Sequence, residues 1–247
     1  MSTFTLGPII GDVLPNATFP KVQGSTSAIG DLDVYTVPTG RKAFLSANFW
    51  ADYNDNSGGT LVRFLEVKIS GSYYRVTANA SRTVNTGAVT GIFTPMILEA
   101  GDKLAVNTAI TTGNGFPLNY AASIVEFDAG SKLKSARLTG PSSGDNTLYT
   151  CPSSTAAMLV LSQLVTSGQG VTFTADGTQR NIYANIVPNG SSPASTNRFT
   201  TTVVVSANTV NAGVVFGSLT AGDFVNINVD VGAATQFAWV NILERAV

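Results

Sequence analysis

Short runs in which apolar and polar residues alternate are the main pattern of this chain. The clearest run spans residues 224–231, where four apolar residues alternate with three polar ones: Val225, Ile227, Val229 and Val231 against Asn226, Asn228 and Asp230. A period of two predicts a β-strand with one face buried and the other in water. No helical period is sustained anywhere, so the sequence predicts an all-β protein.

Further runs rich in Val, Ile, Thr, Phe and Tyr lie between clusters of Gly, Asn, Asp and Pro, which are turn residues. They cover residues 43–50, 61–69, 73–78, 104–108, 121–127, 157–165, 171–175, 182–187 and 199–205. Short strands at this spacing favour antiparallel sandwiches over units in which helices connect parallel strands.

Three short patterns recur in the same order in the two parts of the chain. Tyr35-Thr36-Val37-Pro38 returns as Tyr149-Thr150-Cys151-Pro152, Ala100-Gly101-Asp102 as Ala221-Gly222-Asp223, and the strand ending at Glu126 as one ending at Glu244. We therefore expect a duplicated unit of about 100 residues, the size of a β-sandwich domain. The alternative is that these patterns are short sequences that occur commonly in strands and turns.

The expected architecture is two tandem antiparallel β-sandwiches, jelly-roll-like, after an extended N-terminal arm. The arm covers residues 1–30, the first sandwich 31–128, a basic linker 129–144 and the second sandwich 145–247.

Composition and charge exclude several classes of function. Charged residues are 12% of the chain, against about 25% in an average globular protein. The net charge of −1 provides no field to attract nucleic acid. Histidine is absent, which excludes Ser-His-Asp and Cys-His nucleophile systems and nearly all zinc sites. No apolar run is long enough to span a membrane. We expect no enzyme activity and no cofactor, and the lone Cys151 is expected to be a buried structural thiol.

The arm and the linker hold the expected partner-binding residues. Glycines and prolines keep the arm from forming one regular strand or helix, so its apolar residues should be buried against the chain's own sandwiches, neighbouring copies or a coat protein. These residues are Phe4, Leu6, Ile9, Ile10, Val13, Leu14 and Phe19. The linker carries Lys132, Lys134 and Arg137 without an acidic residue; it is either a solvated hinge or a contact with an acidic surface.

Two local features suggest other ligands. Residues 52–59 are rich in the oxygen ligands of Ca²⁺, but Ser57 and Arg63 stand where an EF-hand loop needs glycine and glutamate. A plain, metal-free hairpin loop is the expected structure, with a bound cation as the alternative. The pair Tyr73-Tyr74 should place one ring outward, where it could meet a glycan or a neighbouring subunit.

The repeated unit, Tyr-Thr-x-Pro before an apolar strand and Ala-Gly-Asp before an alternating one, resembles β-sandwich structural proteins of tailed-phage virions. These are head decoration or cement proteins, head fibres and tail-associated adhesins, and the resemblance covers both expected sandwiches. It implies a non-enzymatic virion protein, often a homotrimer, with no catalytic residues to carry over.

The function expected from this resemblance is decoration of the outer surface of the head, where the protein would bridge the major capsid protein or other virion proteins. The alternative is a receptor- or glycan-binding module of a tail or surface fibre. A third hypothesis, a calcium-dependent carbohydrate-binding domain of an enzyme, depends on residues 52–59 alone.

Overall fold

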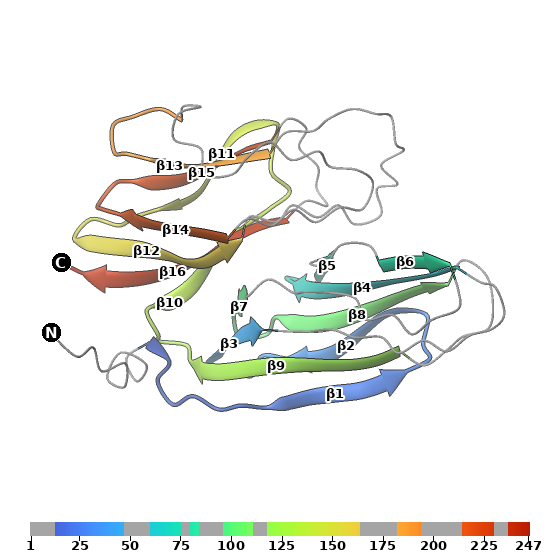
Figure 1. Ribbon diagram of the computed structural model, residues 1–247. Helices are drawn as coiled ribbons and strands as arrows, with labels where there is room; N and C mark the ends of the chain where they lie inside the picture. Colours follow the sequence, from blue (N-terminus) through green and yellow to red (C-terminus); the bar gives the residue numbers. More distant parts are fainter. Residues whose placement is uncertain are drawn as a thin grey trace, which may run out of the picture.

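The computed structural model describes residues 13–46, 60–75, 80–83, 96–110, 118–163, 182–193, 214–229 and 237–247. The elements within these ranges are β-strands in four antiparallel sheets (Figure 1). The prediction of an all-β, antiparallel protein is confirmed. Residues up to 128 are called the first half below, and residues from 129 onward the second half.

The first half contains two sheets. Sheet A has the strand order β1 (Lys21–Thr26), β9 (Leu118–Asp128), β3 (Arg41–Ser46) and β7 (Met96–Leu98). Sheet B has the order β2 (Gly30–Thr36), β8 (Lys103–Ile110), β4 (Thr60–Ile69) and β5 (Ser72–Arg75), and β6 (Ala80–Thr83) also pairs with β4.

The second half repeats this arrangement. Sheet C has the order β10 (Leu133–Thr139), β16 (Phe237–Ala246), β12 (Thr155–Gln163) and β14 (Val214–Leu219). Sheet D has the order β11 (Gly144–Thr150), β15 (Phe224–Val229) and β13 (Ile182–Val187). In Figure 1 the second half lies above the first, with β10 and β7 between them.

The strand pairing of the two halves has the same register. In sheet A, Ala43 lies between Leu98 and Glu126, and in sheet C, Ala157 lies between Leu219 and Glu244.

The second sheet of each half contains the same irregularity. A β-bulge precedes Tyr35 where β2 pairs with β8, and another precedes Tyr149 where β11 pairs with β15. The three recurring sequence patterns therefore occupy equivalent positions in the two halves.

The two Ala-Gly-Asp segments form the same turn. The amide of Gly101 donates to the carbonyl of Val37, and the amide of Gly222 donates to that of Cys151. Both glycines have a positive φ, which is 87° at Gly101 and 86° at Gly222. Residues with a side chain rarely adopt this left-handed conformation, which explains why glycine recurs here.

Each half has its own apolar core, and each core takes side chains from both sheets of its half. The first consists of Val37, Ala43, Leu45, Val67, Ile69, Tyr74, Met96, Leu98, Leu104, Val106 and Ile124, joined by Trp239 of the second half. The second consists of Leu148, Tyr149, Cys151, Ala157, Leu159, Leu219, Val225, Ile227, Ala238, Val240 and Ile242.

The structure corrects two segment assignments. The expected linker 129–144 contains β10, which pairs with β16 along its whole length. The expected arm 1–30 contains β1, which pairs with β9. Both are edge strands with few apolar residues, because an edge strand contributes only the rim of a core, and this leaves little hydrophobic signal in the sequence.

The strand at 224–231 is also only partly as expected. Val225 and Ile227 are buried in the core, but Asn226 on the opposite face is 1% exposed instead of lying in water. Its amide donates a 2.9 Å hydrogen bond to Asp145 Oδ1, which compensates for its burial. The strands expected at 171–175 and 199–205 lie outside the described residues.

Candidate functional site

The predicted arm residues do not form one set in the structure. Val13 and Leu14 are partly buried against a small cluster formed by Ile97, Phe127 and Leu133. Phe19, in contrast, is 74% exposed. The base of the arm is therefore attached to the body of the protein. Phe4, Leu6, Ile9 and Ile10 lie outside the described residues.

The three basic residues of the expected linker also differ in their surroundings. Arg137 donates from Nε to Ser135 Oγ at 2.7 Å and from Nη2 to the carbonyl of Ile97 at 2.7 Å, and Nη1 pairs with Asp102. Lys134 Nζ lies 2.6 Å from Glu244 Oε1. Lys132 is exposed. Arg137 and Lys134 are engaged within the chain and lie on the paired strand β10, so the prediction of a solvated hinge is wrong.

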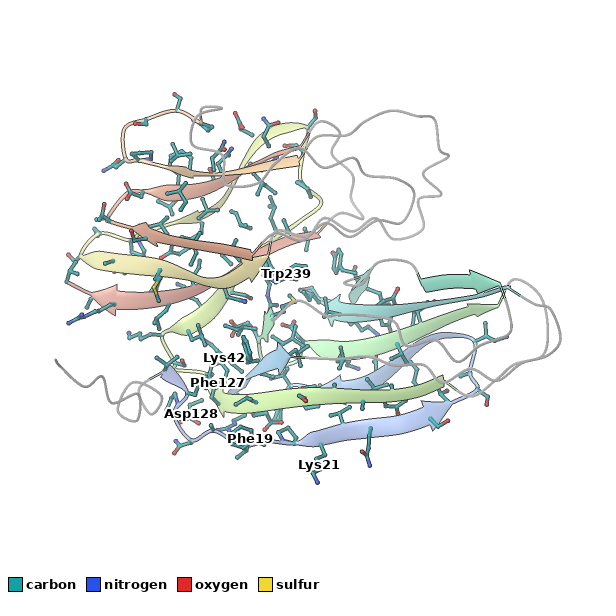
Figure 2. The ribbon with its side chains drawn as sticks, viewed as in Figure 1. Phe19, Lys21, Lys42, Phe127, Asp128 and Trp239 are labelled. Atoms are coloured by element: carbon teal, nitrogen blue, oxygen red, sulfur yellow. The ribbon has the colours of Figure 1, made fainter. Side chains whose placement is uncertain are left out.

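Arg137 belongs to a tight contact between the halves, which we call the junction. There, Asn241 Oδ1 accepts a 3.2 Å hydrogen bond from the amide of Ile97, and Ser135 Oγ donates to the carbonyl of Ile97 at 2.9 Å. Trp239 is fully buried and packs into the core of the first half (Figure 2).

A buried lysine completes the junction. Lys42 Nζ donates to the carbonyls of Ser131 and Leu133 at 3.1 and 3.2 Å, and Glu99 Oε2 lies 4.0 Å away. Burial lowers the pKa of Lys42, while the charge of Glu99 acts in the opposite direction. The junction therefore combines apolar packing with hydrogen-bond donors and acceptors aimed across it.

Within each half, a tyrosine and a glutamate connect the two sheets. Tyr35 OH donates to Glu126 Oε1 at 2.7 Å, and Tyr149 OH donates to Glu244 Oε1 at 2.7 Å. Burial and the nearby carboxylate raise the pKa of both tyrosines. Glu126 and Glu244 therefore both serve to hold the two sheets of their half together.

The cation beside each glutamate comes from a different place in each half. Arg41 pairs with Asp128 at 2.6 Å and lies 3.9 Å from Glu126 Oε2. In the second half Lys134 is the cation, and its Nζ lies 5.5 Å from the centre of the Tyr149 ring.

A polar cluster on the outer face of sheet B has no counterpart in the recurring patterns. Asp33 Oδ2 lies 2.7 Å from Lys103 Nζ and 3.7 Å from Lys68 Nζ, and Asp33 Oδ1 accepts a 2.9 Å hydrogen bond from Tyr73 OH. Burial raises the pKa of Asp33, but hydrogen bonds from Lys103 and Tyr73 and the charge of Lys68 outweigh it, so the pKa is below its usual value. Sequence reasoning missed this cluster, because its members come from four strands.

Tyr73 and Tyr74 lie on opposite faces of β5, as the alternation predicts. Tyr74 is buried in the first core, and the Tyr73 ring lies on the outside with Lys68 Nζ 4.4 Å from its centre.

Cys151 is buried, as expected, and burial raises the pKa of its thiol. Its Sγ lies 3.3 Å from the carbonyl oxygen of Thr155. A protonated thiol held in this way is a structural group rather than a nucleophile.

Within the described ranges, no three His, Cys, Asp or Glu side chains lie where they could hold a metal ion together, and no helix is long and apolar enough to cross a membrane. The loop 52–59, for which a bound cation was the alternative, lies outside those ranges.

Comparison with known proteins gives no relative in sequence, and the solved structures named below are distant likenesses. No family model and no curated protein matches the chain. N-glycanase F is 12% identical, with a TM-score of 0.31, over 92% of this chain and 89% of its own. A tandem of two CBM22 domains from Paenibacillus barcinonensis Xyn10C is 11% identical, with a TM-score of 0.27, over 96% of both chains. A conserved protein of unknown function from Pseudomonas aeruginosa PAO1 is 9% identical, with a TM-score of 0.22, over 94% of this chain and 82% of its own. Scores this low carry no conclusion about function.

Proposed function

We propose that this protein is a non-enzymatic structural protein of a phage virion, which decorates the outer surface of the head and stabilises it by bridging the major capsid protein or other virion proteins. The observation that carries the proposal is the anchored base of the arm. Val13 and Leu14 pack at the junction, and Ser131 Oγ donates a 2.5 Å hydrogen bond to the carbonyl of Val13. The point at which residues 1–12 join the described chain is therefore anchored at the junction.

The scaffold that holds this arm is, we infer, a pair of tandem jelly-roll-like β-sandwiches that arose by duplication. Equivalent registers, bulges and turns in the two halves support this inference, as do two cores that each draw on two sheets. A rigid, duplicated β scaffold with a largely neutral surface suits a protein that adds buried area to an assembled shell.

The arm residues ahead of the anchor are the attachment element of this proposal. Phe4, Leu6, Ile9 and Ile10 are apolar, and full burial of one such side chain stabilises a complex by about 1.5–3 kcal/mol. An exposed ion pair contributes about 0–1 kcal/mol and weakens in salt. Attachment should therefore persist at high salt.

The test is deletion of residues 1–12, which spares Val13, Leu14 and strand β1. The truncated protein should keep the melting temperature of the full chain but should no longer co-sediment with heads assembled without it. Ser153→Glu is the matched control, because it changes an exposed side chain outside the arm and outside residues 129–144 and should leave attachment intact. Undiminished occupancy by the truncated protein would contradict the proposal.

The second candidate function is a receptor- or glycan-binding module of a tail or surface fibre. It is favoured by the outward ring of Tyr73, which lies beside Lys68, Asp33 and Lys103. An aromatic face with adjacent donors and acceptors is a common arrangement for binding a sugar ring. A glycan array compared between the natural protein and Tyr73→Ala tests it: binding lost in the variant supports this function.

A further inference from the structure

The junction joins two different faces of two equivalent sheets. Sheet A contributes the outward face of β3 and β7, with Phe44 and Ile97, whereas sheet C contributes the outward face of β10 and β16, with Leu133 and Leu243. Sheets A and C have the same register, so β1 and β9 of sheet A are equivalent to β10 and β16 of sheet C. In the same way, β12 and β14 of sheet C are equivalent to β3 and β7 of sheet A. One of these faces on each half is left exposed.

The exposed face of sheet A is called the β1 face here. Lys21 pairs with Ser123 as Ser135 pairs with Asn241, and the amide of Glu126 donates to Thr18 as that of Glu244 donates to Lys132. This register places Phe19 at the position of Leu133, Gln23 at that of Arg137 and Ser123 at that of Asn241. Lys21 and Phe19 lie at the outer edge of the first half, away from the junction (Figure 2).

The exposed face of sheet C is called the β14 face. Met158 pairs with Ser218 as Phe44 pairs with Ile97, and Ala156 pairs with Arg245 as Lys42 pairs with Phe127. Met158 therefore holds the position of Phe44, and Arg245 that of Phe127. Asp223 corresponds to Asp102, because the amide of each donates to the carbonyl three residues earlier and closes the turn that contains the glycine.

Two of the large apolar residues that the described part of the chain exposes fall on these two faces. Phe19 is 74% exposed and Met158 is 46% exposed, whereas Leu133, at the position of Phe19, is 7% exposed within the junction. Exposed apolar groups at the positions that a neighbouring half covers elsewhere in the same chain indicate a contact that one copy alone does not complete.

We propose that the β1 face of one copy docks on the β14 face of a second copy, head to tail, and repeats the junction between molecules. Phe19 would pack on Met158 and Arg245. Ser123 would meet the edge strand β14 at Ser218, as Asn241 meets Ile97.

Charge supports the same orientation. Gln23, at the position of Arg137, would approach Asp223 on the β14 face as Arg137 approaches Asp102, and Lys21 on the same face supplies the positive charge. Because the two faces differ, the contact is heterologous, and copies joined in this way form a closed ring or an open filament. This inference goes beyond attachment to a shell, since it depends only on the duplication and names the second copy as the partner.

The first experiment measures mass in solution by light scattering. The natural protein should form species that are multiples of the 25.6 kDa chain. Phe19→Asp and Met158→Asp should each raise the dissociation constant at least tenfold. Ile29→Asp is the control, because Ile29 is 69% exposed but lies on neither face. Lys21→Glu provides a second variant of the β1 face, and melting curves verify that every variant is folded.

The second experiment mixes Phe19→Asp with Met158→Asp. Each variant keeps one intact face, so the mixture should form a 1:1 dimer of about twice the chain mass, which an interface between two identical faces would not produce. A monomeric natural protein, a mixture that stays monomeric, or equal dissociation by Ile29→Asp would each overturn the proposal. Attachment to heads through the arm is measured separately, so the two proposals can fail independently.

Discussion

The phenol of Tyr35 and the carboxylate of Glu126 form a 2.7 Å hydrogen bond that connects the two sheets of the first half. Tyr149 and Glu244 form the same bond at the same distance in the second half. Each tyrosine directly follows the β-bulge of its strand. The duplicated sequence pattern therefore encodes a specific cross-link between sheets as well as a strand and a turn.

Removal of either phenol should destabilise the protein. Tyr35→Phe or Tyr149→Phe takes a donor from a mostly buried carboxylate, so the free energy of unfolding should fall by about 1.5–3 kcal/mol. Urea unfolding measures this change. Tyr73→Phe is the control. Asp33 keeps two lysines nearby in this variant, so its free energy of unfolding should fall by less than about 1 kcal/mol. Equal losses for all three variants would contradict a special role for the two inter-sheet bonds.

Stability should decrease in acid, partly through Glu244. Burial opposes ionisation of Glu244, but hydrogen bonds from Lys134 and Tyr149 outweigh it and hold the pKa below its usual value. A carboxyl with a depressed folded-state pKa stabilises the fold above its unfolded pKa of about 4.3, and the stabilisation is lost as pH falls through the folded value.

Glu244→Gln tests this pH dependence. The variant should be less stable than the natural protein at pH 7, and the difference in the free energy of unfolding should shrink as the pH is lowered below about 4. Some acid dependence should remain in the variant, because the pKa values of Asp33 and Asp223 are lowered too. A difference that stays constant between neutral and acid pH would show that Glu244 acts without its charge.

The three donors of Arg137 should not be replaceable by lysine. Arg137→Lys keeps the charge, but a single ammonium cannot reach Ser135, Asp102 and the carbonyl of Ile97 together. The free energy of unfolding should fall by about 1–3 kcal/mol. Lys132→Met is the control in the same segment and should stay within about 0.5 kcal/mol, since Lys132 is exposed. Thermal unfolding in which Arg137→Lys matches Lys132→Met would rule out this role in the junction.

The two turn glycines, Gly101 and Gly222, allow backbone strain to be separated from a steric clash of an added Cβ. Gly101→Ala should cost about 1–2 kcal/mol, because alanine is strained at φ = 87° but its Cβ would meet no atom within 4 Å. Gly222→Ala should cost more, since its Cβ would overlap the side-chain amide of Asn189. In the background Asn189→Ala the extra cost should disappear. If Gly222→Ala is no worse than Gly101→Ala in chemical denaturation, Asn189 moves aside freely.

Much of the strand pattern could be predicted from the sequence because alternation is a local property. The runs at 61–69 and 182–187 correspond to β4 and β13 to within a residue. The strands that escaped prediction, such as β1 and β10, are edge strands with weak alternation. Their positions are decided by pairing with β9 and β16, which are distant in the sequence.

By itself, the sequence determined the all-β class, the internal repeat and the Gly-Asp turns. Alternation, repeated patterns and the conformational freedom of glycine all depend on residues that are close together in the sequence. Only the tertiary structure decided which groups the charged side chains contact and which core Trp239 enters. Arg137 meets Asp102 across 35 positions, and Trp239 enters the core of the other half. A side chain that protrudes from a strand has no preferred partner along the chain, and its partner is set by which sheets come together when the apolar faces are buried.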